Sequence, residues 1–277
     1  MLGFGMGLIE FNVFGTKFGI GDLSYENEAL SSYNGIIDEV VLTITNALEM
    51  NLHFARYEVF YPRGILFFGP DKKTNSEVIR RVATRIKYGF YHVNTSELLS
   101  KYYTESEENI VALFAEATKN APCILFFDNL DVFLPDYSGH NINSELQKTF
   151  FKEVNKLKWN DKVMIIETVT EPWMFDSKFC KSAQFEKFVY LHTPTKTDRI
   201  GIFKLELNTY SPHKKQRTPI LNIPINKDVD FDVLADMTDE WSWEDITTLC
   251  ISTCNAIVEQ CVKDDKCQKK CDRLFEE

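Results

Sequence analysis

The stretch "GILFFGPDKKTNSEVIRRVA", residues 64–83, decides the fold. Residues 63–70 form an apolar run that ends in glycine and proline, which is typical of a buried strand leaving the carboxyl edge of a parallel sheet. Apolar residues at helical spacing follow over residues 76–89, and Gly89 ends this pattern. A strand, a tight turn and a helix in this order are typical of a phosphate-binding loop, or P-loop.

The loop itself departs from the pattern G-x-x-x-x-G-K-[ST], in which glycines let backbone amides surround phosphate, lysine reaches the terminal phosphates and a hydroxyl binds magnesium. Counted from Gly69, the positions are Pro70, Asp71, Lys72, Lys73, Thr74, Asn75 and Ser76. Thr74 stands at the second glycine and resists a positive φ, and Asn75 stands at the lysine but is short and uncharged. Ser76 keeps the magnesium hydroxyl.

A second alignment of the loop remains open. It uses Lys73 and Thr74 as the lysine and hydroxyl of the motif, with Lys72 as a further cation, and it requires a shorter loop and a longer helix. The helical pattern that follows Glu77 favours the first alignment. Under either alignment, Lys72 and Lys73 can attract an anion.

The remainder of the chain alternates strands and helices. Strand patterns occupy residues 90–94, 123–128, 161–169 and 185–194, and a helical pattern occupies residues 106–122. This alternation predicts an α/β fold, a doubly wound parallel sheet with ligands at its carboxyl edge. Helical periodicity over residues 196–210, 228–238 and 243–262 predicts a small helical domain. We therefore predict a large α/β domain over residues 1–194 and a helical domain over residues 195–277.

Composition limits the function classes. The 277 residues carry a net charge of −10, which argues against a nucleic-acid partner because phosphate neutralisation needs clustered lysine and arginine. The apolar start lacks a basic leading region and contains Glu10, so we predict neither a signal peptide nor a membrane span. The chain has seven cysteines, an odd number, and five of them are crowded between Cys250 and Cys271, which indicates a reducing cytoplasmic or nuclear compartment. Their spacing favours free thiols over a zinc site.

A co-linear set of segments resembles the AAA ATPases, and most closely the second ATPase module of the valosin-containing protein family. The matching segments are "GIGDLSYENEAL" (19–30), "YPRGILFFGP" (61–70), "SKYYTESEENIVALFAEA" (100–117), "NAPCILFFDNLD" (120–131), "TEPWMFD" (170–176) and "DITTLCISTC" (245–254). The resemblance implies an AAA-type P-loop domain with a helical lid. It also implies a hexameric ring that uses ATP hydrolysis to pull a polypeptide through a central pore.

The resemblance also implies site residues, many of which depart from the family. Asp128 ends the Walker B strand and can hold magnesium together with Ser76, but the neighbouring catalytic glutamate is Asn129. An amide takes no proton, and loss of a general base costs on the order of 100-fold to 10,000-fold in rate. The sensor-one asparagine corresponds to Thr170. Glu167 and Glu171 could supply a relocated base, although ordinary surface or loop carboxylates explain them as well.

Three further positions of the family pattern are altered. The arginine fingers that reach a neighbouring subunit's ATP correspond to Lys181 and Gln184, which lack the bidentate guanidinium fork. Trp243, within "SWED" of the helical domain, replaces a glycine against which the nucleotide would pack. In contrast, Tyr102 and Tyr103 keep the aromatic pore-loop positions that grip a translocating chain, or they simply pack against a helix.

These observations predict a degenerate AAA module that does not hydrolyse ATP and acts as a scaffold or regulatory subunit among AAA ring subunits. No cofactor is expected on this hypothesis. The alternative is a weak ATPase that binds ATP and magnesium through Lys72, Lys73, Ser76 and Asp128. A third possibility is a chain with no selected activity.

Overall fold

The computed structural model describes residues 28–49, 62–95, 103–133, 144–174, 185–209 and 229–263. The chain forms two compact units, which we describe separately. One unit includes Tyr33–His192, and the other consists of Gly21–Ser32 and Thr193–Glu277. Residues 28–32, which directly precede Tyr33, therefore belong to the same unit as the carboxyl-terminal helices.

The first unit is built on a parallel sheet, as predicted. Its strands are β1 (Gly64–Phe68), β2 (Gly89–Asn94), β3 (Cys123–Asp128), β4 (Val163–Val169) and β5 (Phe185–Tyr190). They lie in the order β2-β3-β4-β1-β5, and every described pair is parallel. The central strands β3, β4 and β1 are buried on both faces, which explains their continuous apolar sequences. The predicted α/β fold class is confirmed.

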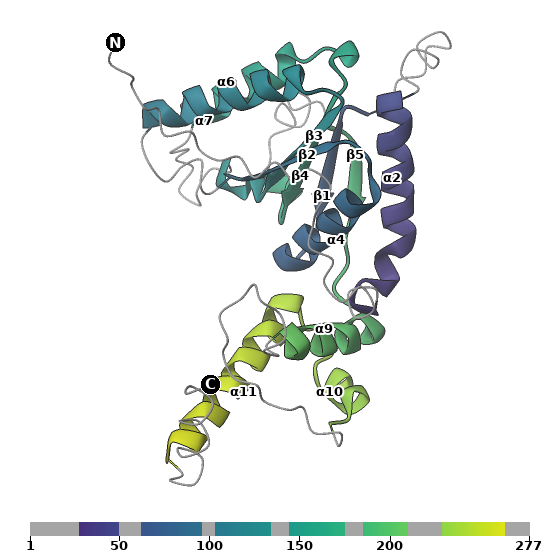
Figure 1. The fold of residues 1–277 in the computed structure, drawn as a ribbon, viewed down its shortest axis with the longest axis vertical. Coiled ribbons are helices and arrows are strands. Elements are labelled where there is room, and N and C mark those ends of the chain that lie inside the picture. The colour runs from purple at the N-terminus through teal and green to yellow at the C-terminus, as the bar shows by residue number, and fades with distance from the viewer. Residues whose placement is uncertain are drawn as a thin grey trace, which may run out of the picture. The chain divides into compact units, whose positions relative to one another are not determined.

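Helices cover both faces of this sheet (Figure 1). On one face lie α2 (Asn34–Glu49) and α4 (Lys72–Arg85), and on the other lie α6 (Tyr103–Lys119) and α7 (Ser144–Lys156). The short 3₁₀ helices are η1 (Ser31–Tyr33), η2 (Leu130–Phe133), η3 (Trp159–Asp161) and η4 (Pro172–Met174). Beneath α6 and α7, Phe150 packs edge-on against Phe127 with ring centroids 5.0 Å apart. Side chains of both helices and the sheet thus form one apolar core.

The start of α4 differs from the prediction. The helix begins at Lys72 rather than at Ser76, and it ends at Arg85, before Gly89. Asp71 is its N-cap, and its side chain accepts a hydrogen bond from the Lys73 amide. The sequence pattern missed this start because the first turn carries polar residues, which give no apolar periodicity. Only residues 69–71 therefore connect β1 to α4.

The second unit is helical. Its described helices are α9 (Lys196–Thr209), α10 (Phe231–Met237) and α11 (Trp243–Lys263). Gly201 of α9 lies so close to the segment before η1 that a Cβ atom there would come within 2.3 Å of the Ala29 nitrogen. The buried Asp198 accepts hydrogen bonds from the hydroxyls of Ser31, at 2.9 Å, and Ser32, which fastens that segment to α9. The role of this unit as a lid stays a prediction.

Candidate functional site

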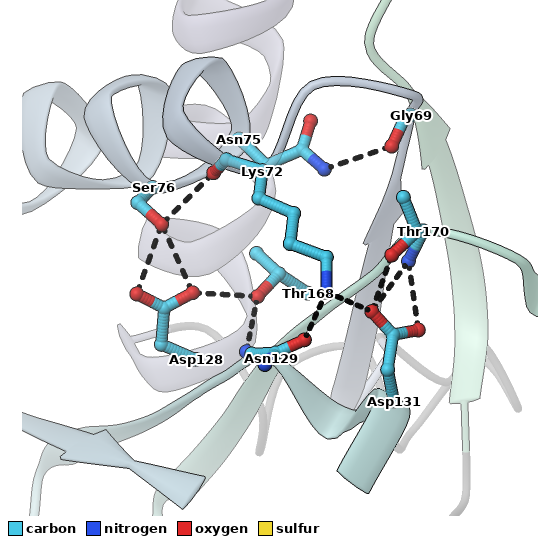
Figure 2. Close-up of polar contacts among 9 residues, drawn as sticks. All are labelled: Gly69, Lys72, Asn75, Ser76, Asp128, Asn129, Asp131, Thr168 and Thr170. Atoms are coloured by element: carbon cyan, nitrogen blue, oxygen red, sulfur yellow. Dashed lines mark hydrogen bonds and ion pairs between the residues drawn. The ribbon is translucent and has the colours of Figure 1, made fainter. Parts of the chain in front are cut away.

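The carboxyl ends of β1, β3 and β4 meet at one edge of the sheet because these strands are neighbours in the order β3-β4-β1. Figure 2 shows the polar side chains that lie there. They come from the β1–α4 connection, from the first turns of α4, from the residues after β3 and from the end of β4. This is the edge where parallel α/β sheets bind ligands. It is therefore the candidate site of the first unit.

The β1–α4 connection places the carboxylate of Asp71 at the start of α4. The Asp71 carboxylate accepts from the Lys73 amide at 3.1 Å and from the Thr74 hydroxyl. The Asp71 carbonyl accepts from the Asn75 amide at 3.0 Å as the first turn closes. A P-loop would direct such amides toward a phosphate. Here the helix amino terminus is capped by a side chain of the loop itself.

Asn75, at the position of the P-loop lysine, points into the protein. Its side chain is 1% exposed, and its Nδ2 donates to the Gly69 carbonyl at 3.3 Å. Among the described residues, its Oδ1 has no hydrogen-bond partner. Thr74 is equally buried. Both side chains therefore serve the packing of α4 against the loop.

Ser76 and Asp128 are brought together, as their assignment to one metal position requires. The Ser76 hydroxyl lies 2.9 Å from each Asp128 carboxylate oxygen. The Thr168 hydroxyl donates to Asp128 at 2.8 Å and accepts from the Asn129 amide at 2.8 Å. His92 Nε2 lies 3.4 Å from the same carboxylate. This contact set agrees with the first alignment of the loop, in which Ser76 is the hydroxyl position, whereas the start of α4 at Lys72 gives the shorter loop and longer helix that the second alignment requires.

The charge state of Asp128 follows from these contacts. Burial alone would raise its pKa, but hydrogen bonds from His92, Thr168 and Ser76 outweigh burial, so the net pKa lies below the ordinary value. Asp128 is therefore ionised at neutral pH. Its negative charge is held by protein donors.

Lys72 bridges α4 to the residues after β3. Its Nζ donates to the Asn129 Oδ1 at 3.2 Å and lies 3.3 Å from Asp131 Oδ2 (Figure 2). Asp131 in turn accepts from the Thr170 amide at 3.0 Å and from the Thr170 hydroxyl. Asn129 has a φ of 64°, a left-handed conformation that asparagine adopts more readily than glutamate. Asn129, at the position of the catalytic glutamate, is thus linked to Thr170, at the sensor position. The link runs through Lys72 and Asp131.

The remaining predicted site residues lie elsewhere. Tyr102, Lys181 and Gln184 fall outside the described residues, and Tyr103 forms the first residue of α6. Trp243 is 2% exposed, and its Nε1 donates to Glu206 Oε1 at 2.8 Å within the helical unit. The indole is a core side chain of that unit, and its effect on a nucleotide stays a prediction.

The structure contradicts the prediction for Glu167 and brings two further residues to the site. Glu167 is fully buried in β4 and is neither a surface nor a loop carboxylate. Its neighbour Thr168 bonds Asp128, so strand alternation turns Glu167 away from the site, where it could not act as a relocated base. The two further residues, Thr168 and Asp131, were not predicted. A strand-end Thr and an Asp just beyond a strand are signals that could have identified them.

Removal of the Asp71 cap provides a test of this local structure. Asp71→Ala is expected to lower the free energy of unfolding by about 1–2 kcal/mol, because the first turn of α4 loses its side-chain acceptor. Asp71→Asn is the matched control, since asparagine caps a helix about as well as aspartate. Chemical denaturation measures both. Equal stability of Asp71→Ala and the wild type would contradict the capping role.

Within the described part of the chain, no group of three or more histidine, cysteine or acidic side chains is arranged to hold a metal ion. No described helix combines the length and the apolar character needed to cross a membrane.

Comparison with known proteins agrees with the fold. Residues 65–193 match the family described as "ATPase family associated with various cellular activities (AAA)". The matched residues span the parallel sheet from β1 to β5.

Two curated relatives are similar to the chain over a longer stretch. The "Putative cell division cycle ATPase" of Plasmodium falciparum is 26% identical over 236 residues, which cover 84% of this chain and 18% of the relative. The "Cell division cycle protein 48 homolog" of Archaeoglobus fulgidus is 30% identical over 192 residues, which cover 68% of this chain and 24% of the relative. The chain spans less than a quarter of the length of each relative.

Proposed function

We propose that this protein is an AAA module that does not hydrolyse ATP and that acts as a scaffold or regulatory subunit in a protein-remodelling assembly. The observation that carries the proposal is the start of α4, where the Asp71 carboxylate accepts a hydrogen bond from the Lys73 amide. A phosphate at the same helix terminus would meet the negative charge of Asp71. The residues of this loop therefore fit a nucleotide phosphate poorly.

The groups around the loop support the same proposal. Asn129 offers an amide where a general base is needed, and its carbonyl oxygen accepts from Lys72. Lys72 is one candidate substitute for the missing lysine, but its Nζ lies 3.3 Å from Asp131 Oδ2. Binding to a phosphate would require it to leave both partners. Because these parts act together in hydrolysis, restoring one of them is not expected to restore turnover.

A second candidate function is weak ATP binding of an unfoldase type. The contact that favours it is the pair Ser76 and Asp128, which keeps the arrangement of a magnesium site at 2.9 Å. On this hypothesis Ser76 and Asp128 would hold magnesium, and Lys72 and Lys73 would attract the phosphates. Magnesium would supply charge neutralisation for the phosphates. We prefer the first function because the Asp71 carboxylate would repel the phosphates of a nucleotide.

The proposed partners are AAA ring subunits, either further copies of this chain or an active relative. The finer likeness to the second module of the valosin-containing protein family supports a ring. The names of the two curated relatives agree with a division-cycle type of AAA ATPase. A polypeptide substrate at Tyr102 and Tyr103, a cytoplasmic or nuclear location and the absence of nucleic acid all remain parts of this proposal.

The assembly test measures the mass of the purified protein alone and after mixing with an active AAA relative from the same source. We expect a defined oligomer or a mixed ring that forms without added nucleotide. Lys181→Glu is expected to reduce the assembled fraction, because this position corresponds to a residue facing the neighbour. Lys148→Glu, on the exposed surface of α7, is the charge-matched control. A protein that stays strictly monomeric under both conditions would refute the scaffold role.

A further inference from the structure

Glu167 is an acid enclosed in the apolar core beneath α6 and α7. The strand register places it between Leu66 of β1 and Phe127 of β3, and all three residues are 0% exposed. Leu66 and Phe127 belong to the core cluster that contains Leu113 of α6 and Phe150 of α7. Parallel partners in register project to the same face of a sheet. The Glu167 carboxyl therefore lies on the face that these two helices cover.

The carboxyl group has no compensating contact in the described part of the structure. Neither of its oxygens has a hydrogen-bond partner there. Burial raises its pKa well above the ordinary value of 4.5, and burial is the cause of the shift. A buried carboxylate is very costly unless a partner neutralises it. The closed core therefore retains the acid in its protonated form.

The charged groups of the surrounding elements are engaged elsewhere. On β3, Asp128 accepts from Ser76 and Thr168 on the opposite face of the sheet. On α7, the buried Glu153 accepts from Lys156 at 2.6 Å.

The other titratable groups nearby are accounted for in the same way. The Cys123 thiol of β3 donates to the Ala117 carbonyl of α6, and Asp131 of η2 pairs with Lys72. The charged residues of α6 for which burial is described are half-buried or exposed, and β1 carries no charged residue. No described charge is thus placed to stabilise an ionised Glu167.

We propose that Glu167 makes the packing of α6 and α7 on the sheet depend on a proton, so that loss of the proton loosens this layer. Because strands flank Glu167 on both sides, water reaches the carboxylate only when the helical layer separates from the sheet. The open form then releases the proton with an ordinary affinity. Glu167 has an ordinary pKa in the open form and a raised pKa in the closed form. At pH values between these two pKa values, the population of the open form rises about tenfold for each unit of pH. This device goes beyond the proposed function and needs no nucleotide.

Hydrogen exchange of the full-length protein at several pH values tests the proposal. Protection factors are compared, because they remove the intrinsic pH dependence of exchange. In the wild type, protection of α6 and α7 amides is expected to fall about tenfold per pH unit above the ordinary carboxyl range. Glu167→Gln, which cannot ionise, is expected to show a flat profile. Glu153→Gln, which changes a buried carboxylate that has a partner, should keep the wild-type slope.

Amides of α2 and α4 provide the internal control, since these helices cover the opposite face and should keep constant protection. A flat wild-type profile, or equal slopes in the wild type and Glu167→Gln, would overturn the proposal. An equal loss of protection in α2 and α4 would also overturn it, because the opening would then be global. Should Glu167→Gln fail to fold, the Glu167 carboxyl carbon is titrated by NMR in the wild type. A protonated signal at neutral pH supports the proposal, and an ordinary titration overturns it.

Discussion

Gly69→Ala is expected to lower the free energy of unfolding by about 2–3 kcal/mol. A Cβ atom at this position would come within 2.2 Å of the Leu191 carbonyl oxygen and within 3.2 Å of its carbonyl carbon. Leu191 cannot yield easily, because its amide donates to the Phe68 carbonyl at 2.8 Å. The clash is with backbone atoms, so rotation of a side chain cannot relieve it. Urea denaturation measures the loss directly.

Gly35→Ala is the matched control for this experiment. Gly35 lies inside α2, and no atom outside its local helix comes within 4 Å of a Cβ placed there. Alanine should therefore stabilise the protein by roughly 0.5–1 kcal/mol through its higher helix propensity. A Gly69→Ala protein as stable as the wild type would show that the glycine is kept for a ligand rather than for packing. The expected result gives this glycine a structural role.

Asp128→Ala is expected to cost about 3 kcal/mol of folding stability. The carboxylate accepts from Ser76 and Thr168, and hydrogen bonds to a charged group contribute about 1.5–3 kcal/mol. Alanine would leave the Thr168 hydroxyl without its acceptor in a part-buried site, and the Ser76 hydroxyl would keep only the Lys72 carbonyl, at 3.1 Å. In an ordinary magnesium site the main loss would be in nucleotide binding. Here we expect a large loss of stability in the absence of any ligand, which thermal and chemical denaturation both detect.

The pH dependence of Asp128 provides an independent check. Because its folded pKa lies below the ordinary value of 3.8, its charge stabilises the folded state above about pH 4. This contribution is lost as the pH falls through the folded pKa. The stability difference between the wild type and Asp128→Asn should therefore shrink in acid. Glu145→Gln, at an exposed pair on α7, should alter stability by less than about 1 kcal/mol at any pH. A constant difference for Asp128→Asn would contradict the assignment.

The sheet could be predicted from the sequence because its strands are continuous apolar runs that end at turn-forming or polar residues. Gly64–Phe68 and Cys123–Asp128 are buried at every residue except the last, and a buried parallel strand needs this composition. The assignment of Ser76 and Asp128 to one site rested on the motif count for Ser76 and on the family resemblance for Asp128, and the structure places the two side chains 2.9 Å apart.

The start of α4 and the state of Glu167 could not be obtained in this way. The first turn of α4 depends on capping by Asp71, which only the folded backbone reveals. Glu167 interrupts an apolar strand, and its sequence neighbours give no sign of which face it occupies. Asp131 reaches Thr170 and Lys72 through the arrangement of η2, a 3₁₀ helix that has no periodic signal. Contacts between distant segments decided each of these cases.

Titration calorimetry with ATP and magnesium tests the central claim most directly. We predict no binding heat and no increase in melting temperature, since a ligand present at about 100 times its dissociation constant would stabilise the fold by about 2.7 kcal/mol. Asp71→Asn, which removes the loop's negative charge while keeping the cap, serves as the sensitised variant. Binding in the low micromolar range by the wild type, lost in Lys73→Ala and Asp128→Asn, would contradict the claim and establish a nucleotide-binding ATPase module.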